Sequence, residues 1–197
     1  MKKRLLLFIA LLSITTALGA GPTYYERGDR LISLKGGAVI PLFSYFFSDK
    51  DLHTGIGKDN TGLLIGGHTD LNYQVFITSH LALGAEVGYG FNRTWDGLLL
   101  QAAPFSATLT YLPLQGQWEL PLSLGIGGIY TTLGSTRVVS PFISVEAALI
   151  YYPGAVWGVG LSTALHLTAE LNTSDELKGD NALLGVLPLT LIITRRW

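Results

Sequence analysis

Nine charged or titratable residues recur along the chain, each inside a stretch where polar and apolar residues alternate. If they share one interior, they could form a gate or a proton-sensitive network, because neighbouring charges shift one another's protonation. The other interpretation, which we favour, is a set of paired ions that stabilise a crowded interior, since an isolated buried charge is costly. Acids outnumber bases, so we expect some carboxyl groups to be protonated or hydrated. The residues are Lys35, His68, Asp70, Glu86, Glu119, Glu146, His166, Glu170 and Arg196.

One short segment carries the residue types of a hydrolytic site. His166 and Thr168 are separated by one residue, and Glu170 follows at the same spacing. Nucleophilic catalysis needs a hydroxyl group within hydrogen-bond reach of a base. Threonine is a poor substitute for serine in this role. We therefore expect no catalytic residues and no enzyme.

The sequence also gives little support for a metal or a cofactor. The chain has no cysteine, which excludes disulfides and thiolate metal sites. Its glycine-rich stretches do not match a phosphate-binding fingerprint. Two acidic clusters could bind Ca²⁺, but neither has the spacing of an EF-hand, and acidic loop ends are more often simply solvated. They contain Asp49, Asp51 and Asp59, and Asp175, Glu176 and Asp180.

The elements that position these residues have a period of two. In the stretch from His80 to Asn92, one set of alternate positions is bulky and apolar, whereas the other is small and carries Glu86. A period of two is typical of a β-strand, because successive side chains leave opposite faces. Eight such segments are present, at about 31–42, 62–76, 80–92, 98–112, 118–130, 138–151, 156–171 and 182–197.

The connections between these segments predict an up-and-down arrangement. Three are tight, at 77–80, 113–117 and 152–155, and the alternate ones are longer and more polar, at 43–61, 93–97, 131–137 and 172–181. Short turns at one end and longer loops at the other are typical of a membrane β-barrel. Prolines fit this pattern least well, since they remove a backbone donor. We expect Pro121 and Pro141 near strand starts, and Pro104 and Pro188 at bulges or shifted boundaries.

The composition indicates which face meets water. Only 14% of the residues are charged, the formal net charge is −1, and 48% are hydrophobic. Soluble domains carry about 25% charged residues. The polar face of each segment is mostly Gly, Ala, Ser and Thr, which suits a narrow lumen better than a water-exposed surface. The bulky apolar face suits lipid. No basic run follows the first four residues, so we expect no nucleic-acid partner.

The first 20 residues have the pattern of an export signal. A basic start, Met1 to Arg4, precedes an apolar run that is too short for a comfortable membrane span, and small residues follow. We therefore predict a signal peptide at 1–20, a short periplasmic lead-in at 21–30 and a barrel at 31–197.

Aromatic residues gather at the ends of the predicted strands. If the chain starts on the periplasmic side, they form two girdles at the two membrane interfaces, where such rings prefer to lie. The outer girdle contains Tyr89, Phe91 and Tyr130, and the inner girdle contains Tyr111, Trp118, Tyr151, Trp157 and Trp197.

The last strand, LPLTLIITRRW, ends in an aromatic residue that follows alternating apolar residues. With the eight segments, it resembles the small eight-stranded outer-membrane β-barrels of the OmpX, OmpW and OmpA transmembrane-domain type, over residues 31–197. The resemblance implies that Leu189, Leu191, Ile193 and Trp197 form the signal read by the barrel-assembly machinery. Arg195 departs from the pattern, because an apolar or aromatic residue is expected there.

We therefore predict an all-β protein, an eight-stranded antiparallel up-and-down transmembrane β-barrel, monomeric in the bacterial outer membrane and surrounded by its lipid. Its predicted role is membrane structure and surface-loop display, with adhesion or contact with a host or surface ligand. One alternative is a porin-like conduit for small or apolar solutes. A remote one is a lipid-modifying enzyme, because His166, Thr168 and Glu170 resemble the His-x-Ser plus acid arrangement of lipid A deacylase barrels. The last alternative is a soluble ligand carrier.

Overall fold

The computed structural model describes residues 24–47, 50–170 and 182–197. The predicted export signal and the start of the lead-in lie outside this part of the chain, as do the last predicted connection, 172–181, and Leu171 before it.

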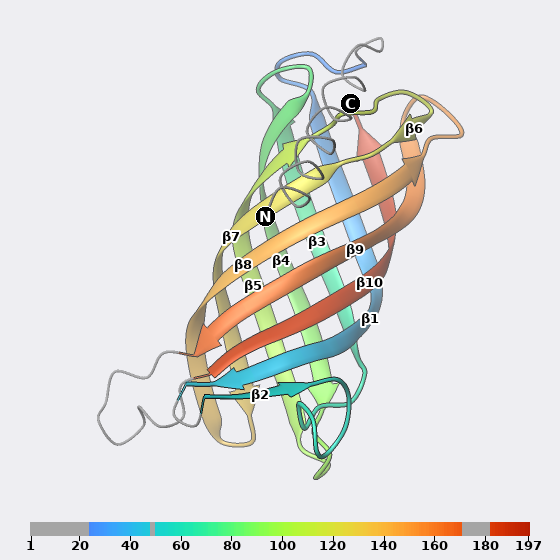
Figure 1. The fold of residues 1–197 in the computed structure, drawn as a ribbon. Coiled ribbons are helices and arrows are strands. Elements are labelled where there is room, and N and C mark those ends of the chain that lie inside the picture. Colours follow the sequence, from blue (N-terminus) through green and yellow to red (C-terminus); the bar gives the residue numbers. More distant parts are fainter. Residues whose placement is uncertain (1–23, 48–49, 171–181) are drawn as a thin grey trace, which may run out of the picture.

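Eight long strands form the wall of the protein, and each pairs antiparallel with its neighbours (Figure 1). Two short strands, β2 (Asp51–Thr54) and β6 (Trp118–Glu119), pair with β1 and β8 respectively. The eight long strands are β1 (Arg30–Phe46), β3 (Gly66–Phe76), β4 (Leu81–Arg93), β5 (Leu99–Tyr111), β7 (Leu122–Leu133), β8 (Thr136–Tyr151), β9 (Trp157–Glu170) and β10 (Ala182–Arg196).

The wall closes because the first long strand pairs with the last. The β1–β10 register runs from Leu31 opposite Arg196 to Phe46 opposite Ala182. The order of the other long strands follows the chain, so neighbours in sequence are neighbours in space. This arrangement is the predicted antiparallel up-and-down barrel, and the fold prediction is confirmed.

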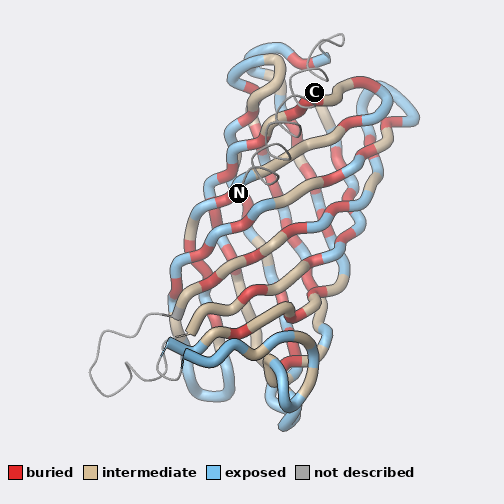
Figure 2. Tube along the Cα trace, viewed as in Figure 1, coloured by how far each residue is buried: buried red, intermediate tan, exposed pale blue. Residues whose placement is uncertain are grey.

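The two faces of each strand differ as the alternation predicts. Along the strands, buried and exposed positions alternate (Figure 2). In β4, Glu86 is 7% exposed and the next residue, Val87, is 55% exposed. Leucines, valines and isoleucines of the other strands, such as Leu191 at 68%, also lie on the outer surface. The polar face therefore lines the lumen. None of the described segments is a helix long and apolar enough to cross a bilayer.

Three local features differ from the sequence prediction. The predicted fifth segment is two strands, β6 and β7, separated by Leu120 and Pro121. The predicted loop at 131–137 is instead a tight turn between β7 and β8, in which Gly134 has a φ of +59°. A left-handed backbone of this kind suits glycine, which has no Cβ to clash. The strand β2 was not predicted, because four residues are too few to show a period.

Pro104 and Pro188 each interrupt one hydrogen-bond ladder without shifting the strand register. Between β4 and β5, pairing stops at Val87–Phe105 and resumes at Gly90–Ala102, on either side of Pro104. Pairing between β9 and β10 is interrupted in the same way around Pro188. The expected bulges at these two prolines are therefore wrong, because a missing N–H removes a bond without adding a residue. The irregularity lies in β1, between Pro41 and Phe43.

Pro121 precedes β7 as expected. Pro141 lies inside β8, opposite Gly128 of β7, so its predicted position near a strand start is wrong. The ladder between β8 and β9 begins only at the next residue, Phe142, so Pro141 interrupts no β8–β9 pair.

Gly127 in β7 provides a test of how closely the strands approach. A Cβ atom built there would lie 2.0 Å from the carbonyl oxygen of Phe105 and 2.6 Å from the Cα of Ser106, both backbone atoms of β5. We expect Gly127→Val to lower the free energy of unfolding by about 3 kcal/mol or more, because overpacking against backbone cannot relax. The heat-modifiable gel shift of the refolded protein measures the folded fraction.

The control is Ala107→Val in β5, which also creates a valine, but at an outward-facing position opposite Ile126. Equal folding of the two variants would show that β5 and β7 do not approach so closely.

Candidate functional site

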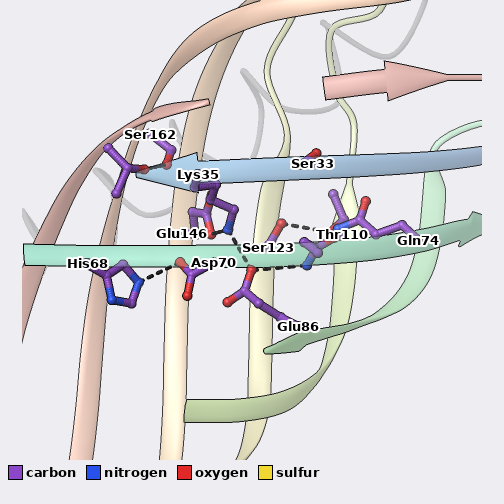
Figure 3. Close-up of polar contacts among 12 residues, drawn as sticks. Ser33, Lys35, His68, Asp70, Gln74, Glu86, Thr110, Ser123, Glu146 and Ser162 are labelled. Atoms are coloured by element: carbon purple, nitrogen blue, oxygen red, sulfur yellow. Dashed lines mark hydrogen bonds and ion pairs between the residues drawn. The ribbon is translucent and has the colours of Figure 1, made fainter. Parts of the chain in front are cut away.

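An ionic layer crosses the middle of the lumen. Lys35 of β1 donates from Nζ to Glu86 Oε2 of β4 at 2.6 Å, and it also forms an ion pair with Glu146 of β8. In the sheet β1 pairs with β10, β3 and the short strand β2, so both partners of Lys35 lie on strands that are not sheet neighbours of β1. Asn72 of β3 also donates to Glu86 Oε2, at 3.1 Å. Figure 3 shows these side chains converging from different strands.

A histidine pair lies beside this layer. His68 Nε2 is 2.6 Å from Asp70 Oδ2, and both residues belong to β3 (Figure 3). The ring of His166, from β9, packs edge-on against His68, with 5.2 Å between the ring centroids, and against Phe142 at 4.9 Å. Asp70 Oδ1 is buried and has no hydrogen-bond partner among the described residues.

The charges of this central region are unequal. The three carboxyl groups of Asp70, Glu86 and Glu146 face one ammonium group, that of Lys35. Because an unpaired buried charge is costly, Lys35 is the group on which the stability of this layer depends.

A second cluster closes the end of the barrel at which the lead-in and Arg196 lie, the end predicted to face the periplasm. Its centre is Glu119 of β6, which is fully buried. Glu119 Oε2 accepts a hydrogen bond of 3.0 Å from the Tyr25 hydroxyl, and Glu119 Oε1 pairs with Arg196 Nη1 at 2.6 Å. The Arg196 guanidinium lies over the Tyr152 ring, 3.9 Å from its centroid. The cluster joins the lead-in, β6, the β8–β9 turn and the end of β10.

The lead-in is therefore part of the barrel base. The Tyr25 ring stacks on Phe76 at 3.9 Å between centroids. The backbone follows it, because Gly28 donates to the Phe76 carbonyl at 2.9 Å and Phe76 donates to the Asp29 carbonyl at 2.8 Å. The sequence analysis missed Tyr25. The available signal was an aromatic pair, Tyr24 and Tyr25, within an otherwise polar lead-in.

Burial changes the acid–base behaviour of Tyr25, Glu119 and Tyr152 in this cluster, three residues that lie outside the eight membrane-spanning strands. Desolvation raises the pKa of Glu119 to about 7, although the hydrogen bond from Tyr25 and the charge of Arg196 oppose the shift. Desolvation and the nearby Glu119 carboxylate raise the pKa of Tyr152 to about 12. The same causes raise the pKa of Tyr25.

Two small cavities lie in the lumen, one on each side of the ionic layer. The cavity toward the β2 end has a volume of about 50 Å³ and is mostly apolar, with Ile129, Phe142 and His166 in its wall. The periplasmic cavity has a volume of about 30 Å³, and Lys35, Glu119 and Glu146 line it. Each has room for a few water molecules only.

The predicted charged residues do not form one network in the described part of the protein. They divide into the Lys35 layer, the histidine pair with Asp70, and the Glu119–Arg196 pair at the periplasmic end. Glu170 ends β9, and its side chain lies outside the described residues.

The predicted aromatic girdles lie at opposite ends of the strands. Tyr89, Phe91 and Tyr130 are exposed near the ends of β4 and β7, and Trp118, Trp157 and Trp197 are exposed at the other end. Tyr111 and Tyr151, which end β5 and β8, are partly exposed. The predicted assembly residues Leu189, Leu191, Ile193 and Trp197 also face outward.

The closed wall, the apolar outer surface and the ionic interior define a class of protein, the small β-barrels of the bacterial outer membrane. Three solved barrels have a similar fold. OprG of Pseudomonas aeruginosa has a TM-score of 0.53 at 11% identity, over 89% of this chain and 99% of its own. Neisserial surface protein A has a TM-score of 0.50 at 13% identity, over 86% of this chain and 97% of its own. Ail of Yersinia pestis, in complex with the heparin analogue sucrose octasulfate, has a TM-score of 0.50 at 13% identity, over 87% of this chain and 99% of its own.

The sequence comparisons place the chain within a family. A model of one protein family matches residues 16–190, so the chain belongs to that family. A curated relative, an uncharacterized protein of Treponema pallidum (strain Nichols), is 31% identical over 101 residues, which are 51% of this chain and 46% of that protein. The match thus spans about half the length of each. With its outer-membrane fold and its apolar outer surface, the chain is a protein of the bacterial outer membrane.

Removing the amine of the ionic layer tests whether it stabilises the barrel. We expect Lys35→Met to lower the free energy of unfolding by about 3–5 kcal/mol, because it leaves buried carboxylates without a counter-ion. The triple variant Lys35→Met/Glu86→Gln/Glu146→Gln should recover most of this loss. Urea unfolding in lipid vesicles, followed by tryptophan fluorescence, measures both.

The control is Lys58→Met on the exposed β1–β3 connection. A loss below about 1 kcal/mol for Lys35→Met would contradict a stabilising ion layer.

The pKa of Glu119 predicts a pH dependence. A carboxyl group whose pKa is higher in the folded than in the unfolded protein binds protons preferentially when folded, so stability falls as pH rises between the two values. We expect the urea midpoint to fall as the pH rises from about 4.5 to about 7. Glu119→Gln should flatten this dependence, whereas Glu26→Gln, on the exposed part of the lead-in, should not. Equal slopes for the two variants would assign the dependence to another group.

Proposed function

We propose that the protein is a membrane-embedded scaffold that keeps its lumen closed and displays its extracellular segments at the cell surface, for adhesion or contact with a host or surface ligand. The observation that carries this proposal is the bridge from Lys35 to Glu86 and Glu146 across the middle of the lumen. The Glu119 cluster adds a second closure at the periplasmic end. A conducting pore would need both to open.

The hydrogen-bonded structure of the proposed extracellular end supports a role in displaying segments at the cell surface. After β2, the chain bonds to the β4–β5 turn: Leu64 donates to the Arg93 carbonyl at 2.8 Å, and Trp95 donates to the Gly62 carbonyl at 2.9 Å. Apolar side chains such as Leu52 and Trp95 are exposed on this structured surface. Exposed apolar groups on an ordered surface are suited to binding a partner.

A second candidate is a conduit for small or apolar solutes. The mostly apolar cavity near Ile129 and Phe142 favours it, because such a solute could enter from the extracellular end. This cavity ends at His68 and His166 on the side of the ionic layer, so passage would need the layer to rearrange.

We propose no enzymatic activity. Thr168 Oγ1 donates to the carbonyl of Pro141 at 3.1 Å, and the His166 ring packs between His68 and Phe142. This geometry does not present an activated hydroxyl group. The proposed partners remain outer-membrane lipid and, during biogenesis, the barrel-assembly machinery, with the barrel as a monomer and no nucleic acid bound.

Planar-bilayer recording tests the closed lumen. We expect no steady currents from folded, heat-modifiable protein, because the side chains of an eight-stranded barrel fill its lumen. Steady wild-type currents would favour the conduit. Display is checked in parallel by antibody labelling of residues 55–62 on intact cells, since a surface segment is labelled without permeabilisation. A segment labelled only after permeabilisation would contradict display.

A further inference from the structure

Two arginines and two tryptophans occupy neighbouring positions on the outer wall, at the end that carries the lead-in. Arg195 of β10 lies opposite Trp157 of β9 in the strand register. Trp197, which directly follows the end of β10, exchanges backbone hydrogen bonds of 2.9 Å and 3.1 Å with Arg30 of β1. Residues directly opposite and diagonal on one face of a sheet are within reach of one another. We call these four residues the Arg–Trp lattice.

The guanidinium group of Arg195 lies between the two indole rings. Its Cζ atom is 5.8 Å from the Trp157 ring centroid and 5.3 Å from that of Trp197, both within range of a cation–π interaction. Strand alternation places it outward, whereas its neighbour Arg196 points inward to Glu119. Adjacent arginines of one strand therefore serve opposite faces of the wall.

Neither arginine of the lattice has an anionic partner in the described part of the protein. The ion pairs there involve Lys35, His53, His68 and Arg196. Arg30 and Arg195 are both exposed, and Trp157 and Trp197 are 57% and 48% exposed. An arginine facing the membrane without a counter-ion is costly unless the surroundings supply one.

The depth of the lattice identifies that counter-ion. Trp157 and Trp197 belong to the periplasmic aromatic girdle, and such rings lie at the level of the lipid headgroups. The anion available at this level is the phosphate of a phospholipid, and a planar guanidinium group binds phosphate through paired N–H donors. We propose that the Arg–Trp lattice binds the phosphate of one phospholipid of the periplasmic leaflet. The arginine that breaks the apolar pattern of the last strand thus acquires a ligand.

Native mass spectrometry in detergent tests the proposal directly. The wild-type protein, with phosphatidylglycerol added, should retain one lipid molecule. We expect Arg195→Gln to weaken this retention about tenfold, because it removes a charge-assisted contact to phosphate. Arg195→Lys should fall between the two, since it keeps the charge but loses the planar stacking. Retention by Arg195→Gln equal to the wild type would overturn the site.

The matched control is Arg93→Gln. It removes an exposed arginine at the end of β4, on the opposite end of the barrel from the lattice, and this variant should retain the lipid. An equal loss in this variant would show non-specific charge attraction and overturn the proposal. Added inorganic phosphate should not displace the lipid, because the apolar wall holds its chains; displacement would assign the site to free phosphate instead. The heat-modifiable gel shift of each variant separates loss of the site from loss of folding.

Discussion

The hydrocarbon core of a membrane offers no partner to a backbone N–H or C=O group, and this constraint shapes the whole protein. Each unpaired group would cost several kcal/mol in lipid, so a sheet that crosses the bilayer cannot keep a free edge. Pairing of β1 with β10 removes the edge. Once the wall is closed, the period of two in every strand separates an outer surface of leucine, valine and isoleucine from an inner surface of small and ionic side chains.

Closure also limits the interior. Eight strands enclose a lumen that their own side chains nearly fill, so a charge placed there must find its partner across the lumen. Lys35 does so with Glu86 and Glu146, and Glu119 does so with Tyr25 and Arg196. The two lumen cavities described above, one on each side of the Lys35 layer, are small. The same interactions that stabilise the wall thus close the path through it, which is why we propose display rather than transport.

The face of each residue could be predicted from the sequence, but its partner could not. Alternation alone places Glu86 inward and Val87 outward, because the period fixes side-chain direction. It does not give the strand tilt or the depth at which two strands meet across the lumen, so the division of the charges into separate groups was not predicted. Tyr25 was missed because two adjacent aromatic residues in a short polar segment show no periodicity. The tight turn at Gly134 was missed because most of the residues around it, Thr131, Thr132, Ser135, Thr136 and Arg137, are polar and resemble a longer loop.

The most direct test of this inside-out polarity uses nitroxide labels at two cysteines, introduced singly into the natural cysteine-free chain. Val87 faces outward, and Ala102 lines the lumen cavity. The account predicts high accessibility to oxygen, which dissolves in lipid, for the label at position 87, and low accessibility at position 102. A lipid-exposed label at 102 together with a packed label at 87 would contradict it.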